Sequence, residues 1–349
     1  MARRRPRQRR FPWPATLGLR PGELVEVRSR EEILATLNRD GCLDGMPFMP
    51  EMLAFCGHRF RVLRRAEKSC DTVLEGGGRR VVDTVHLDDV RCDGAAHGGC
   101  QALCLIWWRE AWLKRIDPAS NTSREEAAWI PDALCDEDSL QRATQVRGLI
   151  DATVYRCQVT RMLEFTYGVR WWDPRAVLRE VRSGNVTVPE AAGVVGRAAM
   201  NVIRRRVLKR RPEPHITGRC TGRTPSERIE GLQPGDWVEV KSQQEIEETL
   251  DRHQKNRGLF FDIEMLPYCG RKLRLLRRVD RIIDESTGAM RRLPNDCWIL
   301  EGAVCEGRMS RHRLFCTRRI YGYWREIWLR PTAPPTQDDG PQPLRIQNA

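Results

Sequence analysis

The sequence predicts an α+β fold in which two copies of a small β-rich, metal-stabilised module flank a helical domain. Three observations carry this prediction. The first is an internal repeat: "RPGELVEVRSREEILATL" from Arg20 returns as "QPGDWVEVKSQQEIEETL" from Gln233. The second is a change to helical spacing of apolar residues between the two copies. The third is a loop, residues 92–104, that holds three cysteines and a histidine.

The repeat keeps one offset, 213 residues, over most of its length. The offset pairs Phe48 with Phe261, Glu51 with Glu264, Cys56 with Cys269 and Cys92 with Cys305. After three extra residues in the second copy, "WREAWLKR" matches "WREIWLRP". Chance does not align so many positions, so we expect both copies to fold alike.

Each copy predicts the same elements in the same order. "GELVEV" and "GDWVEV" alternate in polarity and predict strands, as do "RFRVLRR", "KLRLLRR", "RRVVDTVHLDDV" and the closing "WREAWLKR". Ser29 with Glu32, and Ser242 with Glu245, have the spacing of a capping box, which predicts a short helix after the first strand. Several strands and one helix in so short a copy favour a small barrel or roll, SH3-like in outline.

The tryptophans of the closing segment have two interpretations. Trp107, Trp108 and Trp112 can stack on bases or sugars, but core packing is favoured because one face of a closing strand must be buried. Arg109 and Glu110 beside them, repeated as Arg325 and Glu326, are expected to form either an outward-facing pair or a salt bridge across strands.

The region between the copies is expected to be helical. Apolar spacing predicts one amphipathic helix from Ser139 to Thr166, and Asp173 before Pro174 predicts a second helix start. Thr187 with Glu190 predicts a third helix, running to about Arg211. The expected organisation is therefore a basic disordered arm (1–19), first module (20–116), helical domain (117–212), linker (213–232), second module (233–331) and disordered tail (332–349).

Charge and cysteine content indicate partners and compartment. The formal net charge of +13 favours an anionic partner. Prolines interrupt the segment after the arginine-rich start, so it does not have the pattern of a secretory signal, and no stretch has the roughly 20 apolar residues of a membrane span. Thirteen cysteines without an export signal are typical of reduced thiols or metal ligands, which predicts a cytoplasmic protein.

The loop at 92–104 is the candidate metal site. Thiolates and imidazoles are the usual zinc ligands, and Gly94, Gly98 and Gly99 allow a chain to wrap around an ion. Zinc is the favoured metal, since iron–sulfur clusters prefer cysteine alone. Alternatively, "HGGC" is a nucleophilic thiol with its activating imidazole. The four predicted ligands are Cys92, His97, Cys100 and Cys104.

The second copy repeats this pattern in part. Cys305, His312 and Cys316 keep the order of ligands, but Ile320 occupies the position of Cys104. A fourth ligand from Cys297 or Cys269, an open coordination position, or no metal at all are the alternatives.

A basic stretch is the predicted nucleic-acid-binding element. Its cations can follow phosphates, although cations are also favoured at a solvated helix end. The function that these features favour is a non-enzymatic binding or scaffold protein for nucleic acid or another anionic partner. The alternatives are a metal- or thiol-dependent enzyme using the 92–104 cluster, and an accessory protein that binds a biosynthetic enzyme through its tryptophan strands. The candidate cations are Arg204, Arg205, Arg206, Lys209, Arg210 and Arg211.

Overall fold

The computed structural model of the chain describes residues 13–74, 77–117, 119, 133–148, 153–170, 173–294, 296–310 and 312–335. Most of the predicted arm (1–12) and of the tail (336–349) lies outside these residues. The chain forms two compact units. Unit 1 contains Met1–Ala191 together with two segments of the second repeat, Ile283–Arg291 and Phe315–Arg318, and unit 2 contains the remainder.

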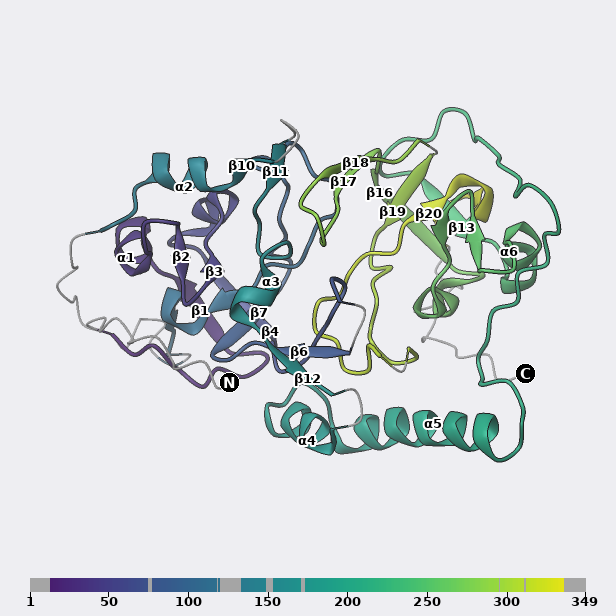
Figure 1. Cartoon of the computed structure of the whole chain (residues 1–349), viewed down its shortest axis with the longest axis horizontal. Coiled ribbons are helices and arrows are strands. Elements are labelled where there is room, and N and C mark those ends of the chain that lie inside the picture. The colour runs from purple at the N-terminus through teal and green to yellow at the C-terminus, as the bar shows by residue number, and fades with distance from the viewer. Residues whose placement is uncertain are drawn as a thin grey trace. The chain divides into compact units, whose positions relative to one another are not determined.

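Unit 1 contains a five-stranded antiparallel sheet in the order β8-β7-β4-β1-β9 (Figure 1). The expected first strand is β1, and the alternating basic segment is β4, with Val25 opposite Phe60. A one-turn 3-10 helix, η2 (Glu110–Trp112), joins the last two strands. The strands are β1 (Leu24–Val27), β4 (Arg59–Arg65), β7 (Thr84–Leu87), β8 (Trp108–Arg109) and β9 (Leu113–Arg115).

Small sheets and short helices surround this sheet. The strands are β2 (Cys42–Leu43) with β3 (Met46–Pro47), β5 (Ser69–Cys70) with β6 (Gly78–Arg80) and β12 (Tyr167–Val169), and β10 (Gln145–Arg147) with β11 (Thr153–Tyr155). The helices are α1 (Arg30–Thr36), η1 (Pro50–Phe55), α2 (Glu137–Ala143), α3 (Met162–Phe165) and α4 (Pro174–Arg182).

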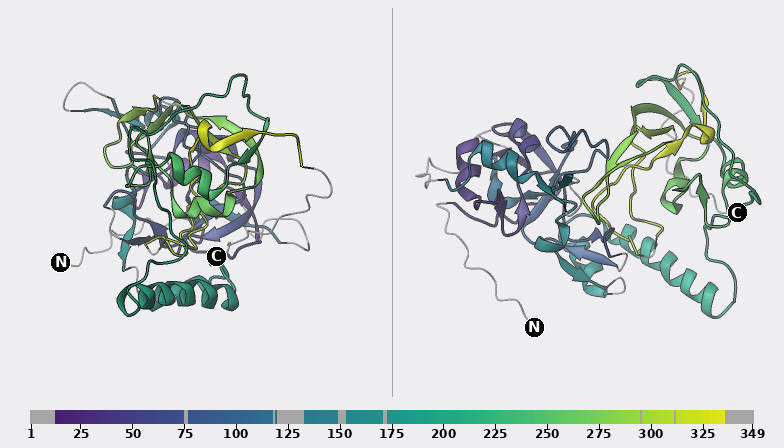
Figure 2. Two further views of the ribbon diagram at one scale, coloured as in Figure 1. Left: turned by 90° about the vertical axis from the view of Figure 1, so that its right-hand side faces the viewer. Right: turned by 45° about the horizontal axis from the view of Figure 1, so that its top comes forward.

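Unit 2 repeats the main sheet in the order β20-β19-β16-β13-β21. Its elements are β13 (Trp237–Val240), α6 (Gln243–Thr249), β14 (Lys255–Asn256), β15 (Leu259–Phe260), η3 (Ile263–Tyr268), β16 (Lys272–Arg278), β19 (Cys297–Leu300), β20 (Trp324–Arg325), η4 (Glu326–Trp328) and β21 (Leu329–Pro331). Helix α5 (Val188–Arg206) and the hairpin β17 (Arg281–Ile283) with β18 (Met290–Arg292) have residues in both units. Figure 2 shows α5 as one unbroken helix.

The two units have equivalent cores. Phe48 packs edge-on against Trp108 and Trp112, and its repeat partner Phe261 packs in the same way against Trp324 and Trp328. All four tryptophans are buried, so the core interpretation is confirmed. Both predicted capping boxes form and start α1 and α6. These are the local signals that hold in both copies.

The described structure is a mixed fold of many small antiparallel sheets and helices, and neither main sheet closes into a barrel within it. The SH3-like barrel therefore stays a prediction. No helix among the described residues is long and apolar enough to span a bilayer.

The helix predicted from Ser139 to Thr166 is wrong. Helix α2 ends at Ala143, where the Thr144 hydroxyl hydrogen-bonds back to the Gln141 carbonyl. The β-branched residues that follow pair as β10 and β11, and helix resumes only in the four residues of α3. Apolar spacing alone did not distinguish two short helices around a hairpin from one long helix.

Two strand predictions and one helix end also need correction. Asp83 adopts a positive φ of 50° and divides "RRVVDTVHLDDV" into β6 and β7, while η2 interrupts "WREAWLKR". Helix α5 ends at Arg206 rather than Arg211, because Lys209 has a φ of 53° and the Arg210 amide bonds back to the Arg204 carbonyl. By contrast, α4 starts at Pro174 with Asp173 as its cap, as predicted.

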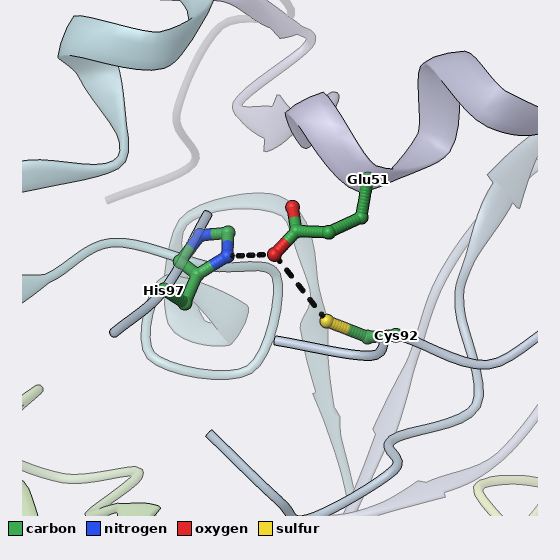
Figure 3. Close-up of side chains that lie close together, drawn as sticks. All are labelled: Glu51, Cys92 and His97. Carbon is green, nitrogen blue, oxygen red and sulfur yellow. Dashed lines mark hydrogen bonds and ion pairs between the residues drawn. The ribbon is translucent and has the colours of Figure 1, made fainter. Parts of the chain in front are cut away.

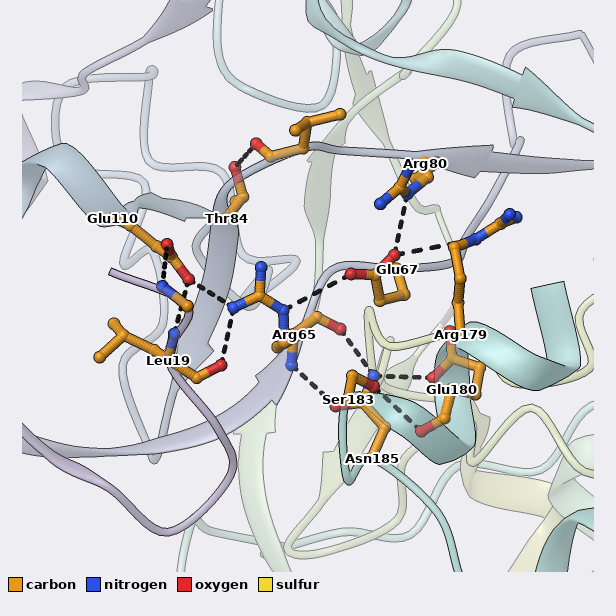
Figure 4. A network of polar contacts seen from close by, with 12 residues as sticks. Leu19, Arg65, Glu67, Arg80, Thr84, Glu110, Arg179, Glu180, Ser183 and Asn185 are labelled. Carbon is orange, nitrogen blue, oxygen red and sulfur yellow. Dashed lines mark hydrogen bonds and ion pairs between the residues drawn. The ribbon is translucent and has the colours of Figure 1, made fainter. Parts of the chain in front are cut away.

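Glu110 and Arg109 do not point outward. Both side chains are buried, and the Glu110 carboxylate accepts hydrogen bonds from the amides of Leu17, Gly18 and Leu19 at 2.7–2.9 Å. Arg65 forms an ion pair with the same carboxylate (Figure 4). The turn η2 breaks the alternation of the strand, so that the neighbours Arg109 and Glu110 are both buried, whereas a continuous strand would place them on opposite faces.

Candidate metal centre

Three side chains of unit 1 whose types can bind a metal ion meet beside η1. One ligand atom each from Glu51, Cys92 and His97 lies within 4.8 Å of the others (Figure 3). His97 Nδ1 is 2.6 Å from Glu51 Oε1, and Cys92 Sγ is 3.9 Å from the same oxygen. Glu51 belongs to η1, whereas Cys92 and His97 belong to the loop after β7.

Glu51 was not among the predicted ligands. Although burial raises the pKa of Glu51, hydrogen bonds from His97 and the Ala96 amide outweigh this effect and keep the pKa below its usual value. Its repeat partner Glu264 likewise accepts hydrogen bonds from the amides of Met309 and Ser310, both at 2.7 Å. The pairing of Glu51 with Glu264 in the sequence repeat was therefore a signal: in both copies this carboxylate holds the cysteine loop.

All four predicted ligands line one cavity of unit 1, of about 30 Å³. A fifth residue, Cys157, lines it from a different part of the chain. The rest of the wall is largely apolar and includes Met49, Leu105, Ile106 and Trp107. The spacing of the 92–104 loop gave no sign of Cys157, since only the tertiary fold brings "YRCQ" to this loop.

The cavity thiols are neighbours in a low-dielectric site. Burial raises the pKa values of Cys92, Cys104 and Cys157, and negative charge on neighbouring thiols, Cys100 among them, raises these values further. A bound cation reverses this cost, because it stabilises thiolates and releases their protons. The cavity is therefore suited to a soft metal ion. Binding of this ion would convert the neutral thiols of the apoprotein into thiolates that hold it.

The separations of the donors test which metal fits. Zinc–sulfur bonds of 2.3 Å around a tetrahedron place thiolates roughly 3.8 Å apart. Within the described residues, Glu51, Cys92 and His97 are the one group of three donors whose atoms all lie within 4.8 Å of one another. The structure thus brings Cys92 and His97 together, while Cys100 and Cys104 line the same cavity at wider spacing.

The imidazole of His97 is occupied on both sides. Nδ1 faces Glu51, and Nε2 is 3.2 Å from the Arg156 carbonyl oxygen. Neither nitrogen is therefore directed at Cys100, its proposed partner in a nucleophilic pair.

The glycines of the loop are required by its conformation. Gly94, Gly98 and Gly99 all adopt positive φ angles of 63–75°. A Cβ atom on Gly94 would lie 2.1 Å from the Cys100 carbonyl oxygen, and one on Gly98 would lie 2.3 Å from the Tyr155 hydroxyl. The close approach of the loop to itself therefore excludes any side chain at Gly94.

We expect Gly94→Ala to destabilise the protein by about 3–4 kcal/mol, because it combines left-handed strain with a backbone clash. Gly57→Ala is the matched control: its φ is 77°, but nothing lies within 4 Å of the added Cβ, so about 1 kcal/mol is expected. Denaturant unfolding of both variants measures the difference. Equal losses would show that the loop does not close as described.

The second predicted set of ligands is divided between the two units. Cys305 and His312 belong to unit 2, whereas Cys316 belongs to unit 1 and lies beside Cys70. The Cys305 amide donates to the Ile320 carbonyl, as the Cys92 amide donates to the Cys104 carbonyl, so the loop hairpin is retained where the ligand is lost.

Neither proposed fourth ligand joins a cluster among the described residues. Cys297 lies in β19 and accepts a hydrogen bond from Arg325, and burial raises its pKa to about 11. Burial likewise raises the pKa of Cys269 to about 12. Both are typical of packed thiols.

The six cations of the basic stretch lie at the end of α5 and just beyond it. Arg204, Arg205 and Arg206 form the last turn, and Lys209, Arg210 and Arg211 follow the helix. Arg204 forms an ion pair with Glu213 and is half-buried, while the other five side chains are exposed.

Searches against family models, curated proteins and solved structures find no match to this chain.

Proposed function

We propose that this chain is a non-enzymatic binding or scaffold protein whose first unit is organised around a thiolate-held metal centre. One observation carries the proposal: the thiols of Cys92, Cys100, Cys104 and Cys157 line a single small, largely apolar cavity. The largely apolar wall, and the engagement of both His97 nitrogens by Glu51 and the Arg156 carbonyl, favour a structural role over turnover of a substrate.

The ligand set that we propose is these four thiolates. Glu51 and the Arg156 carbonyl engage His97, so the imidazole orients the loop rather than completing the shell. Among the described residues no three of these thiols lie within 4.8 Å of one another, as the ligands of a zinc tetrahedron would. This favours an iron–sulfur cluster, which prefers an all-thiolate shell. Zinc bound by Cys92 with His97 and Glu51 is the second candidate, supported by the short separation of these three donors.

Metal content and absorption of protein purified without oxygen test the proposal. An iron–sulfur centre gives visible absorption with iron and sulfide, and Cys157→Ser removes both. Zinc gives a colourless protein. In that case His97→Asn lowers the zinc content, whereas Cys157→Ser does not. Cys56→Ser is the control in both cases, since Cys56 belongs to unit 1 but does not line the cavity. Protein without metal would refute the proposal.

We further propose an anionic partner, nucleic acid first, for the basic stretch. Two observations support this proposal. Five of the six cations of the basic stretch are exposed, and Glu213 is the one described residue that forms an ion pair with any of them. The folds of the two units also support a binding role. In the main sheet of each unit, a one-turn helix joins the last two strands along the chain. The first strand, β1 or β13, lies between the second and the last strand of its sheet, an order that resembles an SH3-like roll.

We expect neutralisation of Arg205, Arg206, Lys209 and Arg210 to glutamine to weaken binding of a single-stranded oligonucleotide and to flatten its salt dependence. Each lost phosphate contact lowers the slope of log K against log salt by about 0.7. Fluorescence anisotropy at several salt concentrations measures this. The control neutralises four exposed cations elsewhere, Arg39, Arg252, Lys255 and Arg292. If both variants lose affinity equally, the basic stretch is not the site.

A further inference from the structure

The same kind of contact, from a backbone amide to a thiol, occurs twice in unit 1. In the first contact the second copy of the repeat supplies the amide and the first copy supplies the thiol, and in the second contact the reverse holds. The Ile283 amide donates to Cys100 Sγ at 3.4 Å, and the Cys70 amide donates to Cys316 Sγ at 3.1 Å. In the repeat, Ile283 corresponds to Cys70 and Cys316 to Cys100. All four residues belong to unit 1. The exchange therefore places an apolar side chain beside Cys100 but a second thiol beside Cys316.

Cys316 Sγ contacts the backbone of Cys70, and both side chains are buried. Cys70 is 2% exposed and Cys316 is 1% exposed. A hydrogen bond between the two side chains, followed by burial, raises the pKa of Cys70. Cys316, the third predicted ligand of the second copy, is therefore placed to act as one half of a dithiol with Cys70.

Two buried cations lie beside this dithiol. Arg318 Nη1 is 3.9 Å from Cys70 Sγ, and Glu285 orients this guanidinium through a 2.7 Å contact. Lys68 is 2% exposed, and no ion-pair partner for it occurs in the described part of the chain. Burial lowers the pKa of Lys68, whereas negative charge on Cys316 and Cys70 raises it. Arg318 lowers the pKa of Cys70, although the hydrogen bond to Cys316 and burial outweigh it, so positive charge at this place reduces the cost of forming the thiolate that attacks an oxidant.

We propose that Cys70 and Cys316 form a reversible disulfide when the protein meets hydrogen peroxide. The thiolate of one cysteine attacks a peroxide oxygen, giving a sulfenic acid and one water. The second thiol then attacks the sulfenic sulfur, forming the S–S bond and releasing a second water. Two thiols lose two electrons and two protons to one peroxide. The bond ties the Phe315–Arg318 segment to β5 and does not depend on the metal centre.

Peptide mapping by mass spectrometry tests this in the full-length protein after brief treatment with peroxide at a low molar ratio. The expected result is a cross-linked pair of peptides containing Cys70 and Cys316, lighter by two hydrogens and restored by dithiothreitol. Non-reducing electrophoresis should show faster migration of the monomer, which Cys70→Ser and Cys316→Ser each abolish. Cys135→Ser is the control, as another buried cysteine of unit 1, and should keep the shift.

A second variant tests the cations. Lys68→Met should slow formation of the cross-link about tenfold at neutral pH while leaving its identity unchanged. Oxidation of Cys70 or Cys316 to unlinked acids, cross-links to other cysteines, or no oxidation of either thiol in a folded protein would overturn the proposal. An unchanged rate of cross-link formation in Lys68→Met would show that Lys68 does not promote oxidation of the dithiol.

Discussion

Replacing Glu110 with glutamine is expected to lower the free energy of unfolding by about 3–5 kcal/mol, because it breaks a buried, multiply bonded ion pair. The carboxylate binds three consecutive amides of the segment before β1 as well as Arg65. Glutamine keeps the size of the side chain but offers one acceptor oxygen in place of two. Arg65 would then be left in a half-buried site without its main counter-charge.

Denaturant unfolding of Glu110→Gln measures this loss. Glu326→Gln is the matched control in unit 2, since Glu326 occupies the equivalent position. Glu326 accepts from the Ile229 amide and the Trp298 indole. We expect a smaller loss there, because both of these donors are neutral. A loss below 1 kcal/mol for Glu110→Gln would contradict the burial of this ion pair.

The opposite sign is expected for Glu180→Gln, which should stabilise the protein at alkaline pH. Glu180 of α4 is 1% exposed, and one of its oxygens, Oε1, has no hydrogen-bond partner among the described residues. Burial raises its pKa from 4.5 to about 8; the Asn185 amide opposes this rise, and the nearby Glu67 adds to it. Arg64 and Lys68 also face it and lower the pKa. Figure 4 shows this carboxyl beside Asn185, which bonds to the backbone of Arg65.

The sign of the pH dependence follows from proton uptake. Between pH 4.5 and 8 the folded protein keeps the proton on Glu180, whereas the unfolded chain has lost it. Stability therefore falls as the pH rises through this window and levels off above about 8. Glutamine cannot ionise, so Glu180→Gln should remove the decline, adding up to about 4 kcal/mol at pH 8 and little at pH 4.

Unfolding curves of Glu180→Gln at several pH values between 4 and 9 measure this effect. The control is Glu248→Gln, which removes the same charge from an exposed position of α6. If both variants follow the wild-type pH dependence, the carboxyl of Glu180 is ionised in the folded protein.

Much of the fold was predictable because its signals are local. Alternation predicted β1, β4, β13 and β16, and capping boxes predicted the starts of α1 and α6. Prediction failed where two local interpretations compete. Between Ser139 and Thr166, helical spacing also fits short helices around a hairpin. In "WREAWLKR" a one-turn helix buries both Arg109 and Glu110, which a continuous strand would place on opposite faces.

The sequence by itself determined the repeat, the shared order of elements in the two units, the tryptophan cores and the loop that carries Cys92, His97, Cys100 and Cys104. Only the tertiary structure added Glu51 and Cys157 to that loop and paired Cys70 with Cys316. The physical reason is distance along the chain. Caps, strands and close-spaced ligands depend on neighbouring residues, whereas these three cysteines and one carboxylate meet their partners only when separate segments pack around a common core.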